Sequence, residues 1–255
     1  EVLGKGSVKT RDFKEPEKFA DVLSSQIKDA LAEIKEPYTI IGIGIGAPNG
    51  NHHQGTIEFA PNLPWKGVIN LIALFQNHFD VAIHVTNDAN AATIGEYVFG
   101  KAKNLDNFMV VTLGTGVGSG FFSNGKLIYG HDSFAGELGH TIIVHDGRDC
   151  ACGRKGCLET YASVTGLLRT AQIMLAKSSS KSMLRDIPTD QLTGKDIGDS
   201  ASKGDALAVS ILDYTAKRLA FSLANAVAIT SPEAIFLFGG MARAGDLLLG
   251  PLKRY

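Results

Sequence analysis

The sequence FMVVTLGTGVGSG occupies residues 108–120 and joins an apolar, β-branched run to four glycines in seven positions. The run over 108–113 predicts a buried strand. The glycines of 114–120 would let backbone N–H groups approach phosphate oxygens. The stretch is not a Walker loop, because it lacks Gly-Lys-Ser/Thr, and no helical pattern follows it as a dinucleotide fingerprint requires. Taken alone, residues 114–120 are equally consistent with a tight turn between two strands.

Strands and helices alternate on both sides of this stretch, which predicts an α/β fold with a mainly parallel sheet. The predicted strands lie at 38–45, 82–86 and 234–238, and a hairpin over 121–128 turns at Asn124-Gly125. The predicted helices lie at 16–35, 67–79, 89–97, 159–176 and 205–229. Residues 49–66 are predicted to form a long loop, and residues 177–204 a surface loop.

Composition sets the broad class of the protein. The chain has 255 residues, 44% of them apolar and 20% charged, which fits a globular protein with one large domain or two lobes. Its net charge of −1 gives no global field for nucleic acid or anionic membranes. No apolar run reaches the roughly 18 residues of a membrane span, and the N-terminus is not a signal peptide. All three cysteines lie within 150–157, which favours a metal site in a reducing, cytoplasmic compartment over disulfides.

The cysteine cluster is the most specific local motif. His140 precedes CACGRKGC at 150–157, so one imidazole and three thiols lie close together in the sequence. Cys₃His is a standard ligand set for structural zinc, and Gly153 and Gly156 allow the tight turns that such a site needs. The alternative is three unconnected buried thiols. The pattern favours structural zinc bound by His140, Cys150, Cys152 and Cys157.

Three carboxylates stand near these motifs. Asp88 lies in the sequence NDAN at 87–90, where a predicted strand runs into a predicted helix. It could be a helix N-cap, or a ligand-facing carboxylate at the carboxyl end of a strand. Glu137 and Glu159 flank the cysteines. Acidic side chains beside a zinc-bound imidazole suit a ligand with many hydroxyls, whereas each carboxylate taken singly could simply face solvent.

Together these motifs resemble the ROK family (repressors, open reading frames and sugar kinases) of the actin-like ATPase superfamily. They occur in the family's order, as GIGAP (44–48), NLPW (62–65), NDANAA (87–92), LGTGVG (113–118), GELGH (136–140), CACGRKGCLE (150–159) and FGG (238–240). The resemblance implies a two-lobed actin-like ATPase (ribonuclease H-like) fold with a zinc-binding insertion. The small lobe would cover residues 1–87 and the larger lobe 88–255, with a sugar in the cleft between them.

The resemblance also implies roles for individual residues. Asp88 would be the catalytic base that faces the 6-hydroxyl of the sugar. His140 would give one ring nitrogen to zinc and the other to the sugar. The remaining sugar contacts would come from Asn62, Asn87, Glu137, His140 and Glu159, with Gly46 lining the pocket. The nucleotide, accompanied by Mg²⁺, would contact Gly114, Thr115, Gly116, Gly239 and Gly240.

The implied function is ATP-dependent phosphorylation of a hexose at its 6-hydroxyl, with glucose converted to glucose 6-phosphate. The alternatives are a ROK kinase for N-acetylmannosamine, N-acetylglucosamine, allose or fructose, and a sugar-responsive ROK repressor. The expected partners are the hexose, ATP and further copies in a homodimer or homotetramer, with no membrane and no nucleic acid bound by this portion. The family's Asp-x-Gly-Gly-Thr phosphate hairpin and its last helices do not occur here, so the lobes are expected to be incomplete at both ends.

Overall fold

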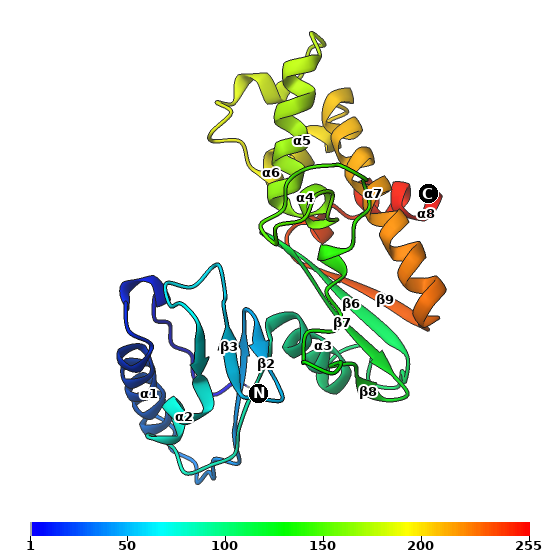
Figure 1. Cartoon of the computed structure of the whole chain (residues 1–255). Helices are drawn as coiled ribbons and strands as arrows, with labels where there is room; N and C mark the ends of the chain where they lie inside the picture. Colours follow the sequence, from blue (N-terminus) through cyan, green and yellow to red (C-terminus); the bar gives the residue numbers. More distant parts are fainter. Residues whose placement is uncertain (1) are drawn as a thin grey trace. The chain divides into compact units, whose positions relative to one another are not determined.

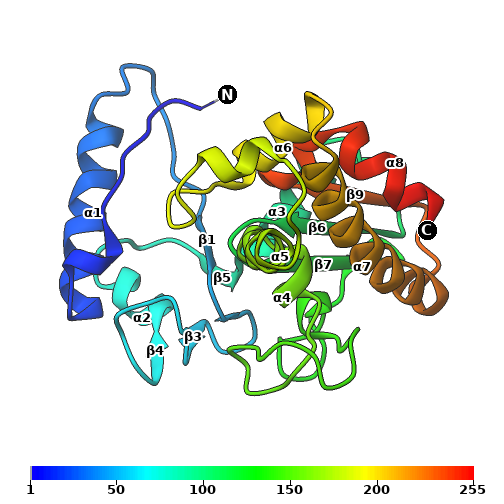
Figure 2. The ribbon, with the colours of Figure 1, turned by 90° about the horizontal axis from the view of Figure 1, so that it is seen from above.

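The computed structural model describes residues 2–255, which form two compact units (Figures 1 and 2). Unit 1 contains the chain up to Ala92 together with Tyr129–Ala135. Unit 2 contains Thr93–Ile128 and Gly136–Tyr255. Each unit has its own apolar core. None of the described helices has the length and apolar composition that crossing a membrane requires.

Unit 1 is built on a helix and two neighbouring parallel strands. Helix α1 (Pro16–Ala32) has proline at its start, and it packs Phe19 and its neighbours on the apolar core. Strands β1 (Ile43–Ala47) and β5 (Ile83–Asn87) pair in parallel, so their carboxyl ends meet at one edge. These elements confirm the predicted helix and strands, although α1 ends earlier than predicted and β1 begins later.

The predicted loop at 49–66 contains regular structure, which corrects that prediction. Strands β2 (Gly50–Asn51) and β3 (Thr56–Glu58) form an antiparallel sheet with β4 (Val68–Asn70). Helix α2 (Leu71–Gln76) starts only after β4, so the predicted helix 67–79 is wrong in its first turn. The reason is that short strands pair through their backbones, which leaves no periodic pattern in the side chains.

Unit 2 contains a four-stranded sheet in the order β8-β7-β6-β9. Its strands are β6 (Phe108–Leu113), β7 (Val117–Ser123), β8 (Lys126–Leu127) and β9 (Ala234–Phe238). Strand β6 pairs antiparallel with β7 and parallel with β9. Gly114–Gly116 are therefore the turn of a hairpin, Val117–Gly120 belong to β7, and the sheet is mixed rather than mainly parallel. The second hairpin turns at Asn124-Gly125 as predicted, with both residues at positive φ.

Strand β6 is buried on both faces, which explains why its sequence is apolar throughout. Met109, Val111 and Leu113 face a core shared with the helices of unit 2, while Phe108 and Val110 belong to a second cluster. Helix α3 (Asp88–Phe99) contributes Tyr97 to that second cluster. The sheet is thus covered on both sides by helices, as the alternation of elements predicts.

The remaining helices are α4 (Glu159–Ala162), α5 (Val164–Lys177), α6 (Gly194–Ser202), α7 (Ala206–Thr230) and α8 (Asp246–Arg254). The predicted helix 159–176 is interrupted at Ser163, whose Oγ accepts a hydrogen bond from Gly166 N and caps α5. The predicted surface loop 177–204 is wrong, because it contains α6 and buries Leu184, Leu192 and Ile197. The apolar residues of this segment are widely spaced among polar ones, so its composition does not indicate that they are buried.

Candidate functional site

Asp88 is the first residue of α3 and directly follows β5 in unit 1. Asn87 Oδ1 and Asp88 Oδ1 each accept a hydrogen bond from Ala89 N at 2.8 Å. Asn87 therefore already supplies the bond to the second helical amide that defines a side-chain N-cap. The Asp88 side chain is exposed, which leaves its second carboxylate oxygen available to a ligand.

Gly46 lies beside this carboxylate at the end of the neighbouring strand. A Cβ atom there would come within 2.9 Å of the Ala91 side chain and 3.5 Å of Asp88 Cα. Glycine thus lets α3 begin close against β1. The structure brings Gly46, Asn87 and Asp88 together, whereas Asn62 lies exposed on the loop after β3. Trp65 anchors that loop, because it is buried and donates from Nε1 to Phe13 O at 3.0 Å.

The predicted zinc ligands converge in unit 2. The ligand atoms of His140, Cys150, Cys152 and Cys157 all lie within 4.8 Å of one another. Cys150 Sγ is 3.6 Å from His140 Nδ1, and Cys152 Sγ is 3.6 Å from Cys157 Sγ. Tetrahedral zinc with bonds of about 2.0–2.3 Å places its ligand atoms roughly 3.5–3.8 Å apart. The residues therefore fit the ion.

Backbone conformation and sulfur chemistry support the same reading. Gly153 and Gly156 both have positive φ, and a Cβ on Gly156 would collide with Val144 O. Burial raises the pKa of Cys152, but hydrogen bonds from Arg154 and the other two cysteines outweigh it and lower the pKa to about 6. Burial and the hydrogen bonds with the other two thiols raise the pKa of Cys157 to about 12. Only a bound cation would hold all three sulfurs as thiolates at neutral pH.

Glu159 connects this cluster to the glycine turn. Its Oε2 accepts from Val117 N at 3.2 Å, and its Oε1 lies 4.0 Å from Cys150 Sγ. A Cβ on Gly116 would overlap Glu159 Oε2, so glycine is needed for the carboxylate to reach this place. Because His140 turns Nδ1 toward Cys150, its Nε2 can serve a second partner.

The glycine turn and the second glycine pair leave the unit 2 sheet at the same edge. Strands β6 and β9 are parallel neighbours, so Gly114–Gly116 and Gly239–Gly240 follow their adjacent carboxyl ends. Gly239 has φ of +100°, and a Cβ there would overlap Leu113 O. Gly114 O accepts from Val164 N at 2.9 Å, and Thr115 is exposed at the tip. The edge thus presents backbone groups and a hydroxyl, which suit a phosphate chain.

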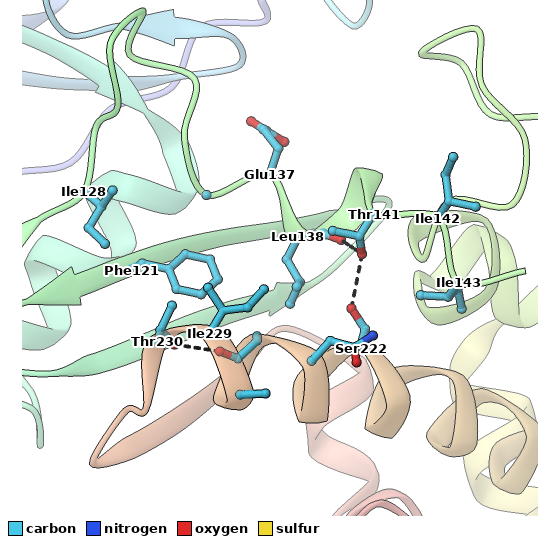
Figure 3. A pocket seen from close by; sticks show the side chains of 14 residues that line it. Phe121, Ile128, Glu137, Leu138, Thr141, Ile142, Ile143, Ser222, Ile229 and Thr230 are labelled. Carbon is cyan, nitrogen blue, oxygen red and sulfur yellow. Dashed lines mark hydrogen bonds between the residues drawn. The ribbon is translucent and has the colours of Figure 1, made fainter.

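A cavity of about 640 Å³ lies between residues 136–143 and α7 (Figure 3). Its lining is dominated by apolar side chains, and Glu137 stands at its border with the carboxylate pointing away from α7. Thr141 Oγ1 donates to Leu138 O at 2.7 Å and lies 3.3 Å from Ser222 Oγ. Such a lining does not match a ligand that presents hydroxyls on every side, so we do not assign this cavity to the sugar.

Two residues that support the site give no motif in the sequence. Ser119 Oγ donates to Gly136 O and accepts from Leu138 N, so it fixes the backbone on both sides of Glu137. Arg148 donates to carbonyls of α4 and α5 and lies 4.5 Å above the ring of Tyr161. Burial lowers the pKa of its guanidinium. Only its place between His140 and Cys150 could have drawn attention to it.

A carboxylate at the end of a parallel strand in one α/β unit, and a glycine hairpin with a Cys₃His cluster in the other, are the features that the resemblance to the ROK family of the actin-like ATPase superfamily implies. The sequence matches the ROK family over residues 5–254. The chain belongs to that family.

Relatives of two kinds share this sequence. A glucokinase from Halalkalibacterium halodurans is 37% identical over 242 residues, which cover 92% of this chain and 73% of that protein. The xylose repressor of Bacillus subtilis is 32% identical over 93% of this chain and 58% of its own length. Among solved structures, a ROK family glucokinase from Streptomyces griseus in complex with glucose and AMPPNP superposes with a TM-score of 0.80. It is 32% identical and covers 100% of this chain and 81% of its own.

Proposed function

We propose that this protein is an ATP-dependent hexose kinase that phosphorylates glucose at the 6-hydroxyl. The observation that carries the proposal is the pair of carboxylates Asp88 and Glu159, each oriented by a hydrogen bond from a backbone amide. Glucokinases with 33–37% identity and a glucokinase structure with glucose and an ATP analogue support it. Reduced cysteines that would bind zinc also suit a cytoplasmic enzyme.

In this proposal Asp88 accepts the proton of the 6-hydroxyl as the bond to phosphorus forms. Phosphoryl transfer depends mainly on positioning and on charge neutralisation, so a single exposed base at a rigid strand end suffices. Asn87 uses its Oδ1 as a helix cap, and its amide nitrogen remains for the sugar. Gly46 supports both residues by letting α3 start where it does.

The other hydroxyls of the sugar are assigned to Asn62, Glu137, His140 and Glu159. His140 would bind zinc through Nδ1 and the sugar through Nε2, because Nδ1 is the nitrogen beside Cys150 Sγ. Zinc bound there would supply rigidity, since coordination through Nδ1 would fix the orientation and the tautomer of the His140 ring. Glu159 Oε2 is already bonded to Val117 N, which orients the carboxylate for a hydroxyl donor.

The nucleotide is assigned to the sheet edge of unit 2. Gly114, Thr115 and Gly116 would contact the phosphates, and Gly239 and Gly240 would lie against the adenosine or its phosphates. Mg²⁺ would enter with ATP and neutralise charge on the transferred phosphoryl group.

The second candidate is a sugar-responsive repressor, which the similarity to the xylose repressors favours. A repressor needs the sugar-binding residues but not a catalytic base. The exposed carboxylate of Asp88, which its helix does not require as a cap, therefore favours the kinase.

The deciding experiment is an assay of the full-length protein with ATP and a panel of sugars: glucose, mannose, fructose, allose, N-acetylglucosamine and N-acetylmannosamine. We expect the highest kcat/KM for glucose and a product phosphorylated at carbon 6. Higher efficiency on another sugar would overturn the glucose assignment. Sugar binding without any phosphorylation, together with sugar-dependent binding of promoter DNA, would support the repressor instead.

A further inference from the structure

The chain makes an excursion out of unit 2 just before the motif that contains Glu137. Residues Tyr129–Ala135 belong to unit 1, although Ile128 and Gly136 on either side belong to unit 2. We call Tyr129–Ala135 the strap. Its two ends are joined by a hydrogen bond from Ala135 N to Tyr129 O at 3.0 Å, so the strap is a closed loop rather than a loose connection.

One short segment of unit 1, Asn51–His53, holds the strap along its length. The ring of His52 stacks on that of Tyr129, with centroids 4.1 Å apart and planes 9° from parallel. Burial raises the pKa of the Tyr129 phenol. Three hydrogen bonds complete the contact, from Asn51 Nδ2 to Asp132 O (3.2 Å), from His53 N to Ser133 Oγ (3.2 Å), and between His53 Nε2 and Gly130 O (3.1 Å).

The segment that holds the strap also packs on the strand that leads to Asp88. His52 Nδ1 lies 3.3 Å from Val85 O in β5. Gly50, immediately before the segment, is so close to Thr86 that a Cβ would overlap the Thr86 carbonyl oxygen. His52 is therefore placed between the backbone of β5 and the ring of Tyr129.

At its other end the strap runs directly into the sugar-binding motif. Only Gly136 separates Ala135 from Glu137, and two residues of chain span at most about 7 Å. Ser119 fixes the backbone on both sides of Glu137. Gly136 is therefore restrained from two directions, by the strap on its N-terminal side and by Ser119 through its carbonyl oxygen. Loosening the strap would remove the first of these restraints, one residue away from Glu137.

We propose that His52 and Tyr129 are positioning residues, which hold the strap and thereby set Glu137 in place for the sugar. The proposal deepens the proposed function and rests on the assignment of Glu137 to a sugar hydroxyl. Neither ring needs to touch the sugar. By restricting the conformations of Glu137 in the free enzyme, they reduce the conformational entropy that is lost when the sugar binds, which favours the complex.

The test compares Tyr129→Ala, His52→Ala, the double variant and Tyr129→Phe in the full-length enzyme. A stacked pair of rings corresponds to about a three- to tenfold change in an equilibrium constant. We expect each alanine variant to raise the KM and the calorimetric Kd for glucose by that factor, with the KM for ATP unchanged. The double variant should raise the KM and Kd for glucose no more than either single variant, because both substitutions remove the same stack. Tyr129→Phe keeps the stacked ring and should stay within twofold of wild type.

Glucose Kd values within twofold of wild type in both alanine variants would overturn the proposal. So would equal losses in glucose and ATP binding, because a general loss of folding would affect both ligands. Failure of the proposed function is seen separately, in the wild-type enzyme: if it prefers another hexose, the same variants are compared with that hexose. If the wild type binds sugar without phosphorylating it, the Kd comparison still decides the role of the stack.

Discussion

Replacing Asp88 with asparagine separates catalysis from helix capping. The amide has the size of the carboxylate and its oxygen can still accept from Ala89 N, which Asp88 now does at 2.8 Å. Asn87 keeps its own bond to the same amide. What the variant loses is a negative charge in the first turn of α3, worth about 0.3–1 kcal/mol in stability, or a fall of about 1–4 °C in Tm.

The catalytic loss should be much larger than this structural one. A general base contributes about 10²–10⁴-fold to the rate, which corresponds to about 2.7–5.4 kcal/mol in the activation free energy. The loss should appear in kcat, with glucose affinity nearly unchanged, because the introduced amide would still hydrogen-bond the 6-hydroxyl but could not take its proton.

The assay is steady-state kinetics of the full-length enzyme, with glucose binding measured by calorimetry. Asp80→Asn is the matched control, since it makes the same change at another exposed position of unit 1 and should leave kcat within about twofold. If Asp88→Asn retains activity within about threefold of wild type, Asp88 is not the base.

Four further predictions concern residues of unit 2. Metal analysis should find one zinc per chain, and a chelator should remove it and lower Tm, because metal binding is coupled to folding; full stability without zinc would refute this. His140→Ala should impair both zinc and glucose binding, whereas Cys150→Ser should affect glucose only through the metal. Gly116→Ala should displace Glu159 and break its bond to Val117 N. The displaced carboxylate would then lose its charged hydrogen bond to a glucose hydroxyl. That bond contributes about 1.5–3 kcal/mol, so its loss predicts a roughly 10- to 150-fold weaker glucose Kd. Gly114→Ala has room for its Cβ and should bind glucose normally; equal affinities in the two variants would contradict the role of Glu159. Finally, 2-deoxyglucose should be at least tenfold less efficient than glucose, because a missing hydroxyl leaves a site carboxylate unpaired; equal kcat/KM values would show that this hydroxyl is not recognised.

The parts of the molecule that the sequence predicts well are those where local chemistry decides the outcome. The spacing of cysteines and glycines around 150–157 is nearly sufficient to form a tetrahedral site, and the four predicted ligands do converge. The apolar run 108–113 predicts a buried strand and the helical periodicity of 205–229 predicts a helix with one buried face, and both predictions are confirmed. Asn-Gly at 124–125 specifies a hairpin turn by its positive φ angles.

The parts that the sequence does not predict depend on distant partners. Ser163 interrupts a helical pattern, because its hydroxyl caps α5 and the next residue, Val164, donates its N–H to the distant Gly114 O. Residues 177–204 are polar in composition, yet Ile197 is fully buried against α7 and its neighbours. The parallel sheet expected from alternation is mixed, since the glycine stretch can serve as a hairpin turn and brings β6 and β7 together antiparallel.

Within the candidate site, too, the sequence predicts some features and not others. Asp88 could be singled out from NDAN, but its distinction from a helix cap required the bond from Ala89 to Asn87. Glu159 could be singled out by its place after Cys157, but Gly116, which makes room for its carboxylate, belongs to a motif that predicts phosphate binding. One glycine thus serves two expected ligands: its missing side chain places the sugar-side carboxylate, and its backbone lies in the turn assigned to the nucleotide. A substitution there should therefore change sugar affinity first, since the backbone of the turn can persist when the carboxylate cannot stay where it is.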